Sequence, residues 1–151
     1  MQKITTWLWF DGQAEEAMAY YTSIFKNSKP GRITRHDGGV LTCSFELEGR
    51  EFTALNGGPQ FKFTEAVSLY VDCADQAEVD YYWEKLTADG GVESQCGWLK
   101  DKFGLSWQII PRRLGELLSD PDAGRSQRAM QAMLKMRKIE VAELERAAAG
   151  G

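Results

Sequence analysis

The side chains best suited to covalent chemistry in this 151-residue chain are three cysteines. Cys96 stands in a polar, glycine-flanked stretch, Gln95-Cys96-Gly97-Trp98, and the ammonium of nearby Lys100 would favour the thiolate that a nucleophile needs. No histidine is close to it in sequence, so a structural or ligand-lining thiol is the preferred alternative. Cys43 and Cys73 fall in strand-like stretches, where buried, reduced thiols are expected.

Acid–base and metal-binding groups are sparse. The single histidine, His36, stands between Arg35 and Asp37 and before two glycines, which indicates a surface hairpin and not a metal ligand. The glutamates fall at helix starts, turns or outward strand positions, where solvation or the helix dipole explains them. Lys100 and Asp101 precede a tight turn, and we interpret them as a local ion pair.

An internal repeat defines the elements that must position these groups. Trp9-Phe10-Asp11 recurs as Tyr70-Val71-Asp72, and the same shift carries Tyr20-Tyr21 onto Tyr81-Tyr82. Each half therefore begins with an apolar strand, a turn containing Asp, and an amphipathic helix with one apolar stripe.

Strand pairs follow each predicted helix. Residues 41–47 alternate apolar with polar, and Glu48-Gly49-Arg50 is a tight turn into a strand at 51–55. The second half has a turn at 102–104 and a strand at 105–110. The turn glycines correspond, so Phe52 matches Trp107 and Thr53 matches Gln108. The order strand, helix, three strands, occurring twice, predicts an α+β protein of two βαβββ modules whose paired sheets enclose a groove.

The predicted segments are 1–58 for the first module, 59–111 for the second and 112–151 for a helical extension, within one compact domain overall. Residues 114–118 indicate a short helix. Asp120-Pro121 indicates the N-cap and first turn of a Met-rich helix that runs to about Lys138. A last amphipathic segment carries Val141 and Leu144. The Met-rich helix needs a surface to cover, which is either its own sheet or a second subunit.

Composition limits the partners. With a net charge of −4, 43% hydrophobic and 26% charged residues, the chain resembles a globular protein that does not bind nucleic acid. It has no apolar window of about 18 residues that could span a membrane and no secretion signal, so we expect a cytoplasmic protein.

Long sequence strings resemble one family. Trp9-Phe10-Asp11-Gly12, residues 52–59, residues 95–108 and residues 114–121 are similar to the PhnB-like branch of the vicinal oxygen chelate superfamily, which has the glyoxalase/bleomycin-resistance fold. Members of this branch are often labelled 3-demethylubiquinone-9 3-methyltransferase. The resemblance covers nearly the whole chain and implies a homodimer with a small-molecule site in the groove of the cupped sheets.

Active members of that superfamily hold a divalent metal through His, Glu or Gln of the first and last strands of each module. The corresponding positions are Thr6 or Trp7, Val67 or Ser68, Thr53 and Gln108, and only Gln108 is a plausible ligand. We therefore expect no metal and no cofactor.

Methyl transfer is disfavoured because the chain lacks the Gly-rich turn of conventional methyltransferases. The expected function is metal-independent binding of a small organic ligand. The alternative is an enzyme of the same superfamily with an unidentified reaction: a metal-dependent lyase or dioxygenase type, or the methyl transfer that the family label suggests. The residues expected to contact the ligand are Trp7, Trp9, Thr53, Asn56, Ser68, Gln95, Cys96, Trp98, Trp107 and Gln108, with Cys96 and Gln108 as catalytic candidates.

Overall fold

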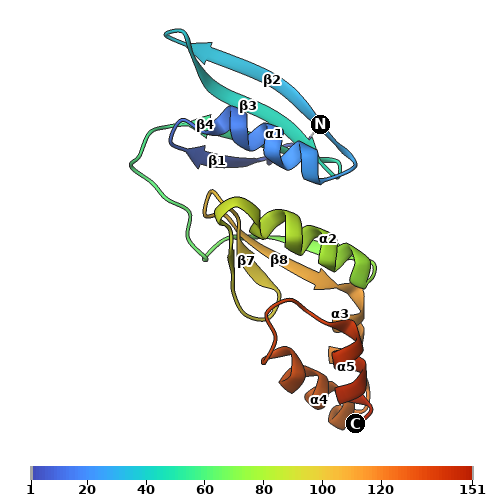
Figure 1. Cartoon of the computed structure of the whole chain (residues 1–151). Helices are drawn as coiled ribbons and strands as arrows, with labels where there is room; N and C mark the ends of the chain where they lie inside the picture. The colour runs from blue at the N-terminus through green and yellow to red at the C-terminus, as the bar shows by residue number, and fades with distance from the viewer. Residues whose placement is uncertain (1, 151) are drawn as a thin grey trace. The chain divides into compact units, whose positions relative to one another are not determined.

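The computed structural model describes residues 2–150; Met1 and Gly151, the outer ends of the predicted segments 1–58 and 112–151, lie outside them. Two compact units divide the chain after Phe63. The first contains β1 (Thr6–Phe10), α1 (Ala14–Ile24), β2 (Ser28–His36), β3 (Gly39–Leu47) and β4 (Arg50–Asn56). The second contains β5 (Ser68–Cys73), α2 (Gln76–Thr87), the 3₁₀ turn η1 (Ala88–Gly90), β6 (Val92–Glu93), β7 (Trp98–Lys100), β8 (Ser106–Pro111), α3 (Arg112–Leu118), α4 (Ala123–Met133) and α5 (Val141–Ala148). Figure 1 shows these elements along the chain.

The first unit is a four-stranded mixed sheet in the order β1-β4-β3-β2, with β1 and β4 parallel and the other neighbours antiparallel. Its core forms between one face of the sheet and α1, where Tyr21, Phe45 and Phe52 stack with ring centroids 6.1 and 5.6 Å apart. Such offset aromatic pairs add to the stabilisation that burial provides. The predicted strand at 41–47 and the turn at Glu48-Gly49 are confirmed.

The second unit repeats this topology in the order β5-β8-β7-β6, with β5 and β8 parallel. Its helix α2 buries Val79, Trp83 and Leu86 against the sheet, where Leu99 and Ile109 are also buried. The predicted α+β arrangement of two βαβββ modules is therefore present in the chain.

The residue shift that relates the two modules is not the same in every element. The buried stripe Ala17, Tyr21 and Ile24 of α1 matches the spacing of Val79, Trp83 and Leu86 of α2, one residue further than the predicted shift. As a result the two Tyr-Tyr pairs are not equivalent. Tyr21 is buried, whereas Tyr81 and Tyr82 are both half-buried and Trp83 takes the core position.

The joint between the units lies later than predicted. The linker residue Phe61 packs edge-on against Trp9, and Phe63 packs against Phe10, with ring centroids 4.9 and 5.5 Å apart. The indole Nε1 of Trp9 donates to the carbonyl of Gly58 at 2.9 Å. These contacts attach residues 57–63 to the first unit, so the boundary falls at 63/64 and not at 58/59.

The C-terminal helices belong to the second unit. Ile110 at the end of β8 shares a buried core with Leu114, Leu117, Ala129, Ile139, Leu144 and Ala148. The Met-rich helix α4 therefore packs mainly on the helices α3 and α5 of its own chain, and not on the sheet, which was one of the two surfaces that the sequence suggested. Met130 and Leu134 remain 40% and 58% exposed. None of the helices within residues 2–150 is long and apolar enough to cross a membrane.

The predicted limits of the Met-rich helix were wrong at both ends. Asp122, and not Asp120, is the N-cap of α4, because its side chain accepts from the backbone N–H of Gly124 at 2.9 Å and of Arg125 at 3.3 Å. Asp120 instead accepts from Asp122 N and from the Arg125 guanidinium. The helix ends at Met133 and not near Lys138.

Candidate functional site

In each unit the helix covers one face of the sheet, and we call the other the open face. On β1, Leu8 and Phe10 are buried toward α1, whereas Trp7 is 58% exposed and Trp9 half-buried on the open face. The sequence showed that these residues form two pairs, and the structure shows which pair faces the helix.

Trp107 does not belong to the open face, contrary to its inclusion among the expected ligand contacts. It lies on the helix-facing side of β8, is 2% exposed, and donates from Nε1 to Asp101 Oδ2 at 2.9 Å. The other oxygen of Asp101 accepts from the backbone N–H of Phe103 at 2.9 Å and of Leu105 at 3.1 Å. The predicted pair of Lys100 with Asp101 was therefore wrong. Lys100 Nζ instead lies 3.0 Å from Glu65 Oε2.

The open face of the second sheet carries a row of three side chains across adjacent strands. Gln108 on β8 is paired in register with Tyr70 on β5 and with Trp98 on β7. Neighbouring strands are about 4.8 Å apart, so the two aromatic residues flank Gln108 with their Cα atoms roughly 10 Å apart. Tyr70 is 58% exposed, and Trp98 and Gln108 are half-buried.

Hydroxyl groups lie next to this row. Gln108 Nε2 donates to Ser68 Oγ at 3.0 Å. Ser106, paired in register with both Ser68 and Lys100, is fully buried, and its Oγ has no hydrogen-bond partner within residues 2–150. Partial burial, followed by the nearby Asp72 carboxylate, raises the pKa of the Tyr70 phenol. Tyr70 therefore keeps its proton and can donate a hydrogen bond at neutral pH.

Tyr70, Ser106 and Lys100 were missed as site residues by sequence reasoning. The available signal was the period of two along the strands, which places Ser106 on the face of Gln108 and Tyr70 on the face of Ser68. The internal repeat misplaced these positions. Matching the first strands of the two modules predicted Ser68 opposite Gln108, whereas in the structure Tyr70 is opposite Gln108.

In the first sheet, Trp7 and Thr53 are register partners on the open face, so the sequence pairing of these two positions is present. Trp9 is partly covered by Phe61 and by Gly57, where an added Cβ would meet the indole at 2.4 Å. Asn56 has a structural role. Its Oδ1 accepts from Ala14 N at 2.9 Å, and its Nδ2 donates to the carbonyl of Val40 at 3.0 Å.

Gln95 and Cys96 form the turn between β6 and β7 that precedes Trp98. Cys96 and Gly97 have φ of 57° and 85°, the left-handed values of a type I′ turn, closed by Trp98 N donating to the carbonyl of Gln95 at 3.0 Å. The N–H groups of Cys96 and Gly97 donate to the carbonyls of Met136 and Arg137, both at 2.8 Å. The turn thus anchors the C-terminal extension.

The remaining reactive groups are also explained by structure. His36 is exposed at the end of β2, with Nε2 3.3 Å from Asp37 Oδ2, which confirms the predicted hairpin position. Burial raises the pKa of the Cys43 thiol and raises that of Cys73 to about 12. Both thiols are therefore protonated at neutral pH and poor nucleophiles.

The donor set does not fit a catalytic divalent metal. The open-face positions that correspond to superfamily ligands hold Trp7, Thr53, Ser68 or Tyr70, and Gln108, all neutral. Residues 2–150 contain no group of three or more His, Cys, Asp or Glu side chains arranged to hold a metal ion. One amide oxygen among hydroxyls and aromatic rings cannot satisfy such an ion.

Comparisons with known proteins agree with this architecture. The family model for 3-demethylubiquinone-9 3-methyltransferase matches residues 2–110. The PhnB protein of Bacillus cereus is 40% identical, with a TM-score of 0.68 over 73% of this chain and 99% of that one. A Pseudomonas aeruginosa protein is 16% identical, with a TM-score of 0.61 over 74% of this chain and 98% of that one. A glyoxalase/bleomycin resistance protein of Albidiferax ferrireducens is 12% identical, with a TM-score of 0.51 over 72% of this chain and 96% of that one. Among curated proteins, none matches significantly. The fold is therefore of the glyoxalase/bleomycin-resistance type, and the chain belongs to the PhnB-like 3-demethylubiquinone-9 3-methyltransferase family.

Proposed function

We propose that this protein binds a small, partly aromatic organic ligand without a metal, in the groove of a cupped sheet, on the open face of the second unit. The observation that carries the proposal is the row Tyr70–Gln108–Trp98. Two aromatic side chains flank one amide on neighbouring strands, and aromatic surface with a few polar groups is the usual composition of a small-molecule site.

The polar groups of the row indicate which hydrogen-bonding groups the ligand carries. Gln108 donates to Ser68 and retains its amide oxygen as an acceptor, while the protonated Tyr70 phenol is a donor. A phenolic hydroxyl satisfies both, because it donates to the Gln108 oxygen and accepts from Tyr70. An aromatic ring bearing a hydroxyl group is therefore the best match to the site.

The alternative is that the same site performs a reaction. The family's label names methyl transfer to a demethylubiquinone, whose ring carries oxygens of this kind, and this favours the same ligand class. Titration calorimetry with S-adenosylmethionine separates the two: saturable binding would support methyl transfer, and its absence together with ligand binding would support a binding protein. Tight, stoichiometric binding of nickel, manganese or zinc would contradict metal independence.

The ligand proposal is tested by fluorescence titration with catechol, with cyclohexane-1,2-diol as the aliphatic control. We expect saturable quenching by catechol only, and loss of this quenching in Trp98→Phe, which removes the indole of the row. Gln108→Leu removes a hydrogen bond and should weaken binding about threefold to tenfold. Gln131→Leu, an exposed position on α4, is the matched control. Equal affinities for the two diols, or an unchanged affinity in Gln108→Leu, would contradict the proposal.

A further inference from the structure

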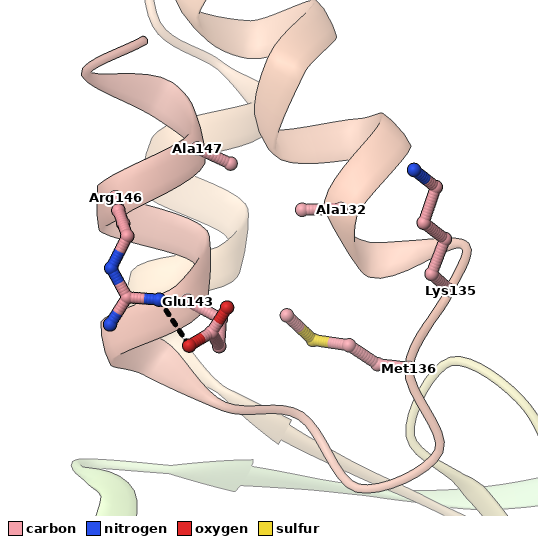
Figure 2. A pocket seen from close by; sticks show the side chains of 6 residues that line it. All are labelled: Ala132, Lys135, Met136, Glu143, Arg146 and Ala147. Atoms are coloured by element: carbon pink, nitrogen blue, oxygen red, sulfur yellow. Dashed lines mark hydrogen bonds and ion pairs between the residues drawn. The ribbon is translucent and has the colours of Figure 1, made fainter. Parts of the chain in front are cut away.

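A pocket lies within the C-terminal extension, outside the residues that the family model matches. It has a volume of about 310 Å³ and lies between the end of α4 and α5. Its lining residues are Ala132, Lys135, Met136, Glu143, Arg146 and Ala147. Figure 2 shows Ala132 and Ala147 pointing toward one another from the two helices, with the Met136 side chain below them.

The segment that closes this pocket is held in place. The carbonyl of Met136 accepts from Cys96 N at 2.8 Å, and its Sδ accepts from Glu140 N at 3.5 Å. The Gln76 amide donates to the carbonyl of Ile139 at 2.9 Å and accepts from Val141 N at 2.7 Å. A ligand would therefore enter a preformed space, without the cost of ordering a loop.

The far wall of the pocket is fixed by an arginine. Arg128 donates from Nη2 to the carbonyl of Ala148 at 2.7 Å, and from Nε to the carbonyl of Ala147 at 3.1 Å. Ala129, Leu144 and Ala148 are fully buried between α4 and α5. The two helices thus keep their separation beside the small side chains of the pocket floor.

The pocket combines an apolar floor with an excess of positive charge. Ala132, Ala147 and the thioether of Met136 provide apolar surface. Arg146 pairs with Glu143, as Figure 2 shows, but a guanidinium has five N–H donors and this pair uses few of them. Lys135 forms no ion pair within residues 2–150 and lies across the opening from Arg146. Two cations and one carboxylate leave a surplus positive charge in a chain whose net charge is −4.

We propose that this pocket binds a small aliphatic carboxylate, with its chain on Ala132, Ala147 and Met136 and its carboxylate at the opening, where Arg146 and Lys135 provide positive charge from opposite sides. Arginine favours the planar, two-oxygen geometry of a carboxylate. Glu143 disfavours a dianion such as phosphate by like-charge repulsion, whereas a monoanion matches the surplus charge. The site is separate from the open face of the second sheet, and its occupancy does not depend on the function proposed for that face.

The test is a titration of the full chain with sodium hexanoate, followed by the backbone amide resonances of residues 132–147. We expect saturable shifts with a dissociation constant on the order of 1 mM, and none with sodium chloride at equal ionic strength or with 1-hexanol. Arg146→Gln and Lys135→Gln should each weaken binding about threefold to fivefold, as expected for partly exposed charges. Glu143→Gln should tighten it, because the competing carboxylate is removed.

Two further variants test whether the shifts come from the pocket and not from a general effect of charge. Arg137→Gln removes an exposed charge beside the pocket without lining it, and should leave the affinity unchanged. Ala147→Leu fills the floor and should abolish the shifts while the rest of the spectrum stays the same. The proposal is overturned if the shifts do not saturate by about 20 mM, if 1-hexanol reproduces them, or if Arg146→Gln binds as well as Arg137→Gln.

Discussion

The buried carboxylate of Asp101 should stabilise the second unit through the indole of Trp107. Asp101→Asn keeps the shape of the side chain and one oxygen for Phe103 N and Leu105 N, but it turns an N–H₂ group toward Trp107 Nε1. The variant loses a charge-assisted hydrogen bond of about 1.5–3 kcal/mol and leaves a buried N–H donor unpaired. Together these should lower the free energy of unfolding by about 3 kcal/mol.

Urea unfolding of a double-mutant cycle with Trp107→Phe isolates the pair. Without the indole donor, Asp101→Asn should cost only about 1 kcal/mol, which gives a coupling energy of about 2 kcal/mol. Asp72→Asn is the matched control, because Asp72 is 55% exposed in its pair with Arg112 and should contribute less than about 1 kcal/mol. Additivity of Asp101→Asn and Trp107→Phe within about 0.5 kcal/mol would refute the reasoning.

Three further outcomes can be measured by the same unfolding experiments. Because burial raises the Cys73 pKa from 9.0 to about 12, the unfolded chain loses this proton first, so stability is complete below pH 9 and declines as the pH rises toward 12. Cys73→Ala should lessen that decline between pH 9 and 10.5 by about 1 kcal/mol per pH unit, and an identical slope would contradict it. Cys96→Val should lower the free energy of unfolding by about 1–2 kcal/mol, because a β-branched residue is disfavoured at the left-handed φ of 57°. Cys96→Gly should stay within about 0.5 kcal/mol of the parent, and equal losses in the two variants would argue against backbone strain. Asn56→Ala should lower the free energy of unfolding by about 1–2 kcal/mol. The N-cap residue of α1 makes no side-chain hydrogen bond, and Asn56 on β4 accepts from the first backbone N–H of the helix in its place. Asn56→Asp keeps this acceptor and should cost less.

Elements that depend on local pattern were predictable from the sequence. Alternation along 41–47 and the glycines of the hairpin turns located strands and turns, because a strand's side-chain period and a turn's positive φ are properties of a few adjacent residues. The same alternation placed Gln108 and Thr53 away from Trp107 and Phe52. The order of elements followed from these local features, and the family resemblance agreed with it.

The functional assignment of those residues required the tertiary structure. The sequence paired Trp7 with Trp9 but could not show that Leu8 and Phe10 face α1, because both pairs are apolar. The sequence predicted an ion pair between Asp101 and Lys100 because the two are adjacent. That the Asp101 carboxylate is buried and accepts from the Trp107 indole depends on the pairing of strands, which the sequence does not show.

The candidate site illustrates the same division. Alternation along the sequence predicted that Gln108 and Trp107 lie on opposite strand faces. The family resemblance, mapped through the internal repeat, indicated neutral side chains at the metal positions of the superfamily. Only the pairing of β8 with β5 and β7 decided that Tyr70 and Trp98 flank it, since loop lengths between strands shift the register by amounts that no local pattern records. Likewise, Lys135 follows α4 and Arg146 lies on α5, and the packing of α4 against α5 brings them to one pocket.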